Sequence, residues 1–256
     1  MTANAGPGAG RQRRALVLAL LAAAGLGACG PAPVPSGIDD PREAQNREIH
    51  AFNKAMDRAI VKPLSGSGEG AAPLRQGVAN LAANLDGPGD VLNGLMQGRP
   101  HHAAQNGLRF AFNTVFGLGG LFDPATAIGL PARPTDFGET LHVWGLPEGG
   151  YAEAPFIGPS TNRDLLGKMV DAAVNPWGNI LPRREANAVT GLRVAGKLAA
   201  RGEYADTVDE VLYDSADSYA QSRLIYLQNR RHQLQQNAGA PSDAGFIDPY
   251  EDPYGN

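Results

Sequence analysis

The stretch GLRFAFNTVFGLGGLFDPATAIGLP, residues 107–131, decides how the centre of this chain folds, because it is among its most apolar parts. Its first half predicts an apolar helix. Gly117, Gly119 and Gly120 follow, and they should end the helix or let the chain turn back, because glycine adopts a positive φ without steric cost. Apolar side chains return beyond the Asp123-Pro124 pair. The pattern therefore predicts two apolar arms joined by a glycine-rich turn.

Two placements of this stretch remain open. A membrane-spanning helix needs about 20 uninterrupted apolar residues. This segment breaks in its middle, so a simple span is rejected. One alternative is a hairpin buried in a protein core. The other is a helix–turn–helix that lies in one side of a bilayer, with Gly117, Gly119 and Gly120 as a hinge between its arms.

The N-terminus carries an export signal. A basic region with three arginines precedes the short apolar run ALVLALLAAAGLGA, and the segment ends in LGAC at Cys29, which is the only cysteine in the chain. We expect signal cleavage before Cys29 and lipidation of its thiol, since each buried acyl methylene contributes roughly 0.8 kcal/mol to anchoring. Gly30 stands where inner-membrane lipoproteins often carry Asp, which favours the outer membrane. The alternative is an ordinary secretory signal with a chance cysteine.

Composition and periodicity divide the remaining chain. We expect a signal peptide at residues 1–28, a lipidated extended tether at 29–39, a helical domain at 40–237 and a disordered tail, rich in Pro, Gly and Asp, at 238–256. The 33 glycines and 20 prolines favour many breaks over long uniform elements. The fold class is therefore predicted to be mainly α, with short helices and glycine-rich turns.

The helix boundaries follow from local signals. Pro41 should open the first helix, with Asp39 or Asp40 as its cap, and Pro63 should stop it. Further helices are expected from Leu74 to the break DGPGD at 86–90, at 91–96, from His102 into the opening stretch, from Thr161, and over 203–236.

Strand signals are sparse. Weak alternation in TLHVWGL, residues 140–146, predicts part of a hairpin.

A catalytic constellation is not found in the sequence. It contains neither a G-x-S-x-G elbow nor a phosphate-binding loop, and GLGGLF lacks the third glycine of a dinucleotide fingerprint. His101 and His102 are adjacent, so they should point apart instead of sharing a metal, while Asp86 and Asp90 resemble turn and cap residues. We therefore expect no catalytic residue, metal or cofactor, and a net charge of −4 gives no reason to expect nucleic acid.

Several ordered motifs resemble one family. They are FNKAMDRAIVKPL (52–64), GVANLAANLDGPGDVLNGLMQGRP (77–100), FNTVFGLGGLFDPA (112–125) and FGETLHVWGLPEGGYAEAPFIGPSTNRD (137–164). They are similar to the MlaA family, also called VacJ, of phospholipid-binding lipoproteins of the outer membrane. The resemblance runs from about Asp40 through YLQNRRHQL. The Gly- and Ser-rich SGSGEGAAP at 65–73 departs from the family pattern.

The resemblance implies a fold and a function. Proteins of this family form a mostly helical ring in the inner leaflet of the outer membrane, and the ring encloses an amphipathic channel. Phospholipids misplaced in the outer leaflet pass through it to a periplasmic carrier of the Mla pathway. The family associates with trimeric porins and acts as a passive conduit without a nucleotide site. We therefore expect a ring of short amphipathic helices around a central channel.

The candidate site residues follow from the same motifs. We expect contacts with the channel or with lipid from Phe52, Asn53, Phe110, Asn113, Leu118 and Phe122. From its spacing alone, Phe52 could equally be an ordinary core aromatic. Two other functions stay open, namely a scaffolding lipoprotein of the outer membrane that moves no lipid and an esterase that acts on lipids.

Overall fold

The computed structural model describes residues 30–66 and 68–239. Cys29, the signal peptide and the tail at 240–256 lie outside the described residues, so the predictions made for them stay predictions. The part of the tether at 30–39 is extended and contacts the domain, because the Ala32 amide donates to the His142 carbonyl at 3.0 Å. Across the described part of the chain, no helix combines the length and apolar character that crossing a membrane requires.

The described residues are mainly helical, as predicted, with one small antiparallel sheet. The elements in chain order are α2 (Glu43–Met56), π-helix η1 (Asp57–Val61), α3 (Lys62–Leu64), 3₁₀-helix η2 (Glu69–Ala71), α4 (Ala72–Met96), α5 (Pro100–Phe116), α6 (Pro124–Ala127), α7 (Phe137–Val143), β1 (Tyr151–Ala154), β2 (Gly158–Thr161), α8 (Asn162–Val174), α9 (Pro176–Ile180), α10 (Arg183–Glu203), α11 (Ala205–Asp209), π-helix η3 (Glu210–Asp214) and α12 (Ser218–Ala238).

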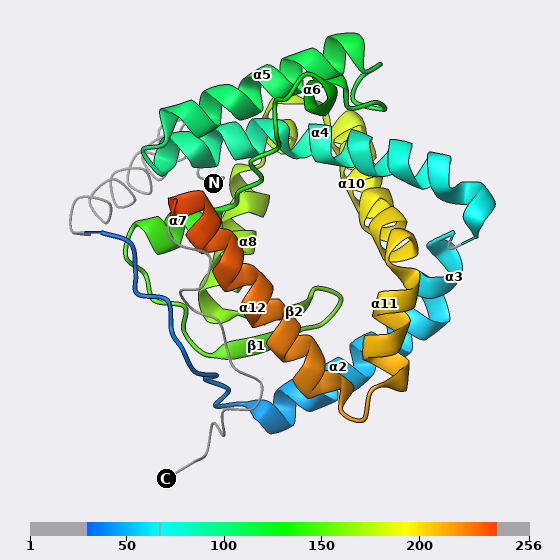
Figure 1. The fold of residues 1–256 in the computed structure, drawn as a ribbon, viewed down its shortest axis with the longest axis vertical. Helices are drawn as coiled ribbons and strands as arrows, with labels where there is room; N and C mark the ends of the chain where they lie inside the picture. The colour runs from blue at the N-terminus through cyan, green and yellow to red at the C-terminus, as the bar shows by residue number, and fades with distance from the viewer. Residues whose placement is uncertain (1–29, 67, 240–256) are drawn as a thin grey trace, which may run out of the picture.

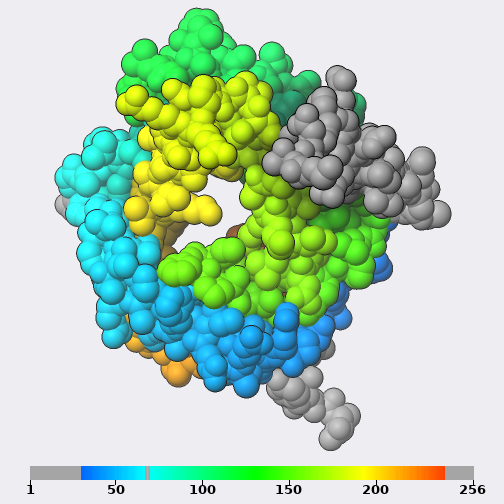
Figure 2. All heavy atoms as spheres, turned by 180° about the vertical axis from the view of Figure 1, so that it is seen from behind, coloured from blue at the N-terminus to red at the C-terminus, as the bar shows by residue number. Residues whose placement is uncertain are grey.

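These elements close into a ring. In Figure 1, α4, α10, α11, α2 and α12 follow one another around a central space, and α5 lies against the outer side of α4. The space-filling view in Figure 2 shows an opening that passes through the molecule. The ring predicted from the family resemblance is therefore present. Its helices are less uniformly short than expected, since α4 has 25 residues and α10 and α12 have 21 each.

Small residues bring the ring helices close together. A Cβ atom added to Gly196 of α10 would lie 2.2 Å from the Cβ of Ala82 on α4. One added to Gly94 of α4 would lie 3.1 Å from the backbone nitrogen of Ala103 on α5. Glycine at these crossings lets the helix backbones approach to a distance that no side chain would permit.

The predicted break at DGPGD is wrong, because α4 continues through Pro88. Asp86 and Asp90 consequently lie inside the helix and are neither turn nor cap residues. A proline in a helix interior removes one backbone hydrogen bond and displaces nearby carbonyls. Here the indole Nε1–H of Trp177 donates to the Leu85 carbonyl at 2.6 Å. Tertiary packing thus supports the helix where its own sequence weakens it.

The predicted hairpin at 140–146 is also wrong, because residues 140–143 belong to helix α7 and the chain turns directly after them. The N-cap of α7 is Asp136, whose side chain accepts a hydrogen bond from the Glu139 amide at 2.8 Å. The capping signal therefore outweighs a weak alternation. The hairpin lies further along the chain, with β1 paired to β2 from Tyr151↔Thr161 to Ala154↔Gly158.

Two more boundaries differ from the predictions. The first helix begins at Glu43 without a side-chain cap and passes Pro63 through η1 and α3. Asp40 instead bonds to Arg223 of α12. The helix expected over 203–236 is interrupted before Ser218, where the Asp217 side chain caps a new helix.

Two predicted starts are confirmed. Thr161 caps α8 by accepting from the Asp164 amide, and α5 begins at Pro100, close to the expected position.

The α4–α10 crossing gives a test. We expect Gly196→Ala to destabilise the fold by about 1–3 kcal/mol, because the new methyl group overlaps Ala82 and the helices must separate. Gly191→Ala on the same helix is the matched control. No atom lies within 4 Å of its added Cβ, so it should gain about 0.5–1 kcal/mol from reduced backbone entropy. Urea unfolding of the purified chain measures both, and equal stabilisation by the two substitutions would contradict this packing.

Candidate functional site

The opening through the ring is the most prominent concave feature of the described part of the chain. Figure 2 shows it bordered by α10, drawn in yellow, and by the light green segment that contains the β1–β2 hairpin. In Figure 1 the turn of this hairpin points from the ring wall into the central space. The site is therefore built from the hairpin turn and from the helices that hold it.

Asn53 of α2 fixes the hairpin turn through its side-chain amide. Its Oδ1 accepts a hydrogen bond from the Phe156 amide at 2.9 Å, and its Nδ2 donates to the Ala154 carbonyl at 3.1 Å. The same Nδ2 lies 3.3 Å from Oε1 of Glu153. One asparagine thus satisfies backbone groups on both sides of the turn.

Aromatic packing joins the same two segments. The rings of Phe52 and Phe156 lie 5.2 Å apart between centroids and meet edge to face at 89°. Phe52 is 42% exposed, so it is not an enclosed core residue. The structure brings the predicted pair Phe52 and Asn53 to the tip of the hairpin. Phe156 and Ile157 were not predicted, although the Pro155–Gly158 turn signal around them could have drawn attention to them.

A second group of predicted residues lies at the end of α5, on the far side of the ring from α2 (Figure 1). The chain turns there with positive φ at Leu118 (53°), Gly119 (76°) and Gly120 (102°). Leu118 and Phe122 are exposed on this turn. Both contribute to an apolar outer edge of the ring.

This turn is held against α4. The Asn84 Nδ2 donates to the Gly119 carbonyl at 3.1 Å and to the Thr114 hydroxyl at 3.0 Å. A Cβ atom added to Gly117 would lie 2.4 Å from the Phe122 carbonyl oxygen, and one on Gly120 would lie 2.4 Å from the Asn84 Cβ. Close approach therefore requires glycine at both positions, whereas Gly119 faces open space.

Asn113 is buried behind the turn. Its Nδ2 donates to Asp123 at 2.9 Å, and its Oδ1 accepts from the Ala125 amide at 3.0 Å. Arg109 also binds Asp123, with 2.8 Å between Nη2 and Oδ2. Burial alone would raise the pKa of Asp123, but hydrogen bonds from Thr126, Arg109 and Asn113 lower it to about 2.

A cavity of about 460 Å³ lies in the wall between α4, α5, α9 and α10. Phe110 and Asn113, both expected to contact the channel or lipid, line this cavity. The sequence did not predict that the two side chains line one cavity in the ring wall. The Phe110 ring lies 6.2 Å from the Trp177 ring across this wall. The lining carries both signs of charge, including Asp90 and Lys197.

Asp90 is the most perturbed carboxyl of the cavity. Its Oδ1 accepts a hydrogen bond from the Thr135 amide at 3.1 Å. Burial raises the pKa of Asp90 to about 8, and the neighbouring carboxylates of Asp86, Asp136 and Asp171 add to the increase. Protonated Asp90 is therefore favoured in the folded protein at neutral pH.

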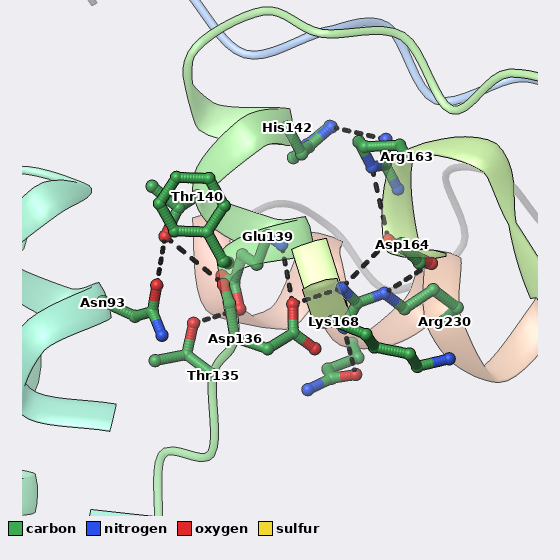
Figure 3. A network of polar contacts seen from close by, with 12 residues as sticks. Asn93, Thr135, Asp136, Glu139, Thr140, His142, Arg163, Asp164, Lys168 and Arg230 are labelled. Atoms are coloured by element: carbon green, nitrogen blue, oxygen red, sulfur yellow. Dashed lines mark hydrogen bonds and ion pairs between the residues drawn. The ribbon is translucent and has the colours of Figure 1, made fainter. Parts of the chain in front are cut away.

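A buried polar network holds α7, α8 and α12 together beside the hairpin (Figure 3). Arg230 lies between Asp136 and Asp164, with donor–acceptor distances of 2.6 and 3.1 Å. Burial would raise the pKa of Asp164, but Arg230 and Arg163 keep it below its usual value. Burial and Arg163 lower the pKa of His142 to about 4, so this histidine is neutral at pH 7.

The histidine pair differs from its prediction. The rings of His101 and His102 do not point apart, since their centroids are 4.2 Å from one another. Within residues 30–66 and 68–239, no group of three or more His, Cys, Asp or Glu side chains is arranged to hold a metal ion.

Comparison with known proteins gives consistent similarities. A family model described as MlaA lipoprotein matches residues 38–233. The intermembrane phospholipid transport system lipoprotein MlaA of Haemophilus influenzae is 32% identical over 225 residues, which cover 84% of this chain and 88% of that protein. The protein of the same name from Escherichia coli (strain K12) is 31% identical over 209 residues, covering 79% and 80%.

A solved structure is similar throughout its length. It was described under "Structural basis for maintenance of bacterial outer membrane lipid asymmetry", and it superposes with a TM-score of 0.64 at 29% identity. The match covers 76% of this chain and 98% of the other.

Asp90 gives a pH-dependent test. Its pKa is about 8 in the folded chain and roughly 3.9 in an unfolded one, so the folded state binds one more proton between these values. The contribution of Asp90 to the free energy of unfolding should therefore fall as the pH rises from about 4 to 8. We expect Asp90→Asn to melt at a higher temperature than the wild type at pH 8 and at a similar one at pH 4. If the melting temperature of Asp90→Asn depends on pH as strongly as that of the wild type, the raised pKa of Asp90 is contradicted.

Proposed function

The chain belongs to the MlaA lipoprotein family, and from this premise we propose that it transports phospholipids and maintains the lipid asymmetry of the outer membrane. Phospholipids misplaced in the outer leaflet enter the ring and pass through it to a periplasmic carrier of the Mla pathway. The protein acts as a passive conduit and not as an enzyme. The ligand is a phospholipid, and no cofactor takes part.

The opening through the ring is the observation that carries this proposal (Figure 2). A lipid conduit needs apolar surface for acyl chains and polar surface for headgroups. The hairpin turn offers exposed apolar side chains at the opening, while the adjacent wall contains a cavity lined by both signs of charge. The ring thus offers both kinds of surface.

The outer edge of the ring supports the proposed location. Exposed large apolar side chains gather on α5 and on the turn that follows it, namely Leu108, Val115, Phe116, Leu118, Leu121 and Phe122. Such a patch favours contact with acyl chains. We place the protein at the periplasmic side of the outer membrane, anchored through Cys29 and embedded in the inner leaflet. The proposed partners are a trimeric porin and the periplasmic Mla carrier.

Two other functions are separable from this one. A scaffolding lipoprotein would use the same anchor but would carry no lipid, so mass spectrometry of the gently purified protein would find no bound phospholipid. An esterase would release fatty acid from a generic ester. Specific co-purification of phospholipid without ester turnover favours the conduit.

Deletion of the protein should let phospholipid accumulate at the cell surface. We expect more surface phospholipid accessible to an externally added phospholipase, and greater sensitivity to detergent combined with a chelator. The wild-type chain should restore both, and Cys29→Ala should not, because its unlipidated precursor stays in the inner membrane. A clean deletion that changes neither readout would contradict the conduit.

We also propose that Gly117, Gly119 and Gly120 form a hinge, since Gly119 faces open space between exposed apolar arms. Motion there requires breaking the hydrogen bonds that α4 donates to the turn, from Asn84 to the Gly119 carbonyl and from Asn80 to the Leu121 carbonyl. Asn84→Ala should therefore change surface phospholipid at unchanged protein level. Abundance in the membrane and surface phospholipid are measured together. If surface phospholipid changes only in proportion to the loss of protein from the membrane, the segment is a tight core turn and the hinge proposal is contradicted.

A further inference from the structure

The β1–β2 turn contains a bulky residue where the backbone favours glycine. Phe156 has a φ of 63°, which a non-glycine residue rarely adopts. Pro155 precedes it, and the Ile157 amide donates to the Ala154 carbonyl at 3.2 Å, so Phe156 occupies the third position of a four-residue turn. In a type II turn this position normally carries Gly or Asn. The left-handed conformation costs a side chain roughly 1–2 kcal/mol.

Packing inside the protein accounts for this phenylalanine only in part, through the edge-to-face contact of its ring with Phe52. The side chain of Phe156 is 76% exposed, and that of Ile157 is 54% exposed. The bonds that hold the turn in place come from Asn53 to the backbone, and they would hold a glycine equally well. A strained residue whose side chain remains mostly exposed despite one ring contact points to a role for that side chain outside the core.

The turn projects into the opening of the ring (Figures 1 and 2). The base of the hairpin is polar and buried, since Glu153 accepts from the Tyr151 hydroxyl at 2.7 Å and lies 3.1 Å from His50. Its tip, residues 154–159, has the sequence APFIGP and contains no charged or hydrogen-bonding side chain. The hairpin therefore presents an apolar tip on a rigid polar support.

We propose that Phe156, together with Ile157 and Phe52, forms an apolar constriction in the ring opening that binds the acyl chains of a passing phospholipid. This inference rests on the proposed transport function and names the residues that contact its ligand. The absence of polar side chains from the tip excludes it as a headgroup site. The edge-to-face contact between Phe52 and Phe156 holds the two rings side by side at the hairpin tip.

The experiment uses the purified full-length chain in a fixed concentration of detergent, titrated with phosphatidylethanolamine and followed by native mass spectrometry. We expect Phe156→Gly to weaken phospholipid binding about tenfold, as loss of much of an aromatic contact implies. Phe156→Leu keeps an apolar side chain and should bind within about threefold of the wild type by the same area argument. Glycerophosphoethanolamine, which has no acyl chains, should bind all variants equally weakly.

Matched controls separate binding from folding. Phe156→Gly relieves the positive φ but loses the ring contact with Phe52, so its melting temperature should stay close to that of the wild type. Leu74→Ala removes a side chain that is 70% exposed in the first turn of α4, away from the hairpin, and should leave binding unchanged.

The outcomes distinguish this inference from the proposed function. If the wild type binds phospholipid and Phe156→Gly binds it with the same affinity, the constriction is overturned and the transport function is not. A wild-type chain that binds no phospholipid would overturn the transport function as well. Weaker binding by Phe156→Gly with an intact fold and normal binding by Phe156→Leu would support the constriction.

Discussion

The ring depends on buried ion pairs between α12 and segments far from it in the sequence. A ring has no single apolar centre, and among the described residues the buried polar side chains outnumber the buried apolar ones. Three arginines of α12 compensate by reaching carboxylates on other elements: Arg223 to Asp40, Arg230 to Asp136 and Asp164, and Arg231 to Glu148. Removing one partner of such a pair costs about 3–5 kcal/mol, because a buried charge is left uncompensated.

These pairs fix geometry more than they add stability. A bidentate contact, such as that of Arg231 with Glu148 at 3.0 and 2.7 Å, specifies both distance and orientation. The same arginine donates to the Gly37 carbonyl at 2.9 Å and so holds the extended N-terminal segment against α12. The segment that leads from the proposed lipid anchor at Cys29 into the domain is thereby tied to the helix that closes the ring.

The closed ring in turn positions the two surfaces that a lipid needs. The buried Tyr151, Glu153 and His50 support the hairpin from below, and Asn53 fixes its turn, so the apolar tip projects into the opening. The exposed apolar residues of α5 face outward instead. Under the proposed function, acyl chains contact apolar surface both at the hairpin tip and on the outer edge of the ring.

The sequence by itself determined the features that rest on short-range signals. Cys29 and the apolar run before it predict a lipoprotein signal, Thr161 caps its helix as expected, and the motifs from Phe52 to Asp164 indicate the family and hence a mainly helical ring. The end of α5 at Phe116 and the turn after it were also predictable from Gly117, Gly119 and Gly120. Each of these features depends on residues that are neighbours along the chain.

Only the tertiary structure decided the rest. Helix α4 passes Pro88 with support from Trp177, which is 92 residues from its acceptor Leu85, so no local pattern could predict it. The role proposed for Phe156 likewise depends on the tertiary structure, because its turn faces an opening only after the ring has closed. Closure joins residues as distant as Asp40 and Arg223, 183 positions apart. The physical reason is that periodicity and capping act within a few residues, whereas a ring is defined by contacts between its ends.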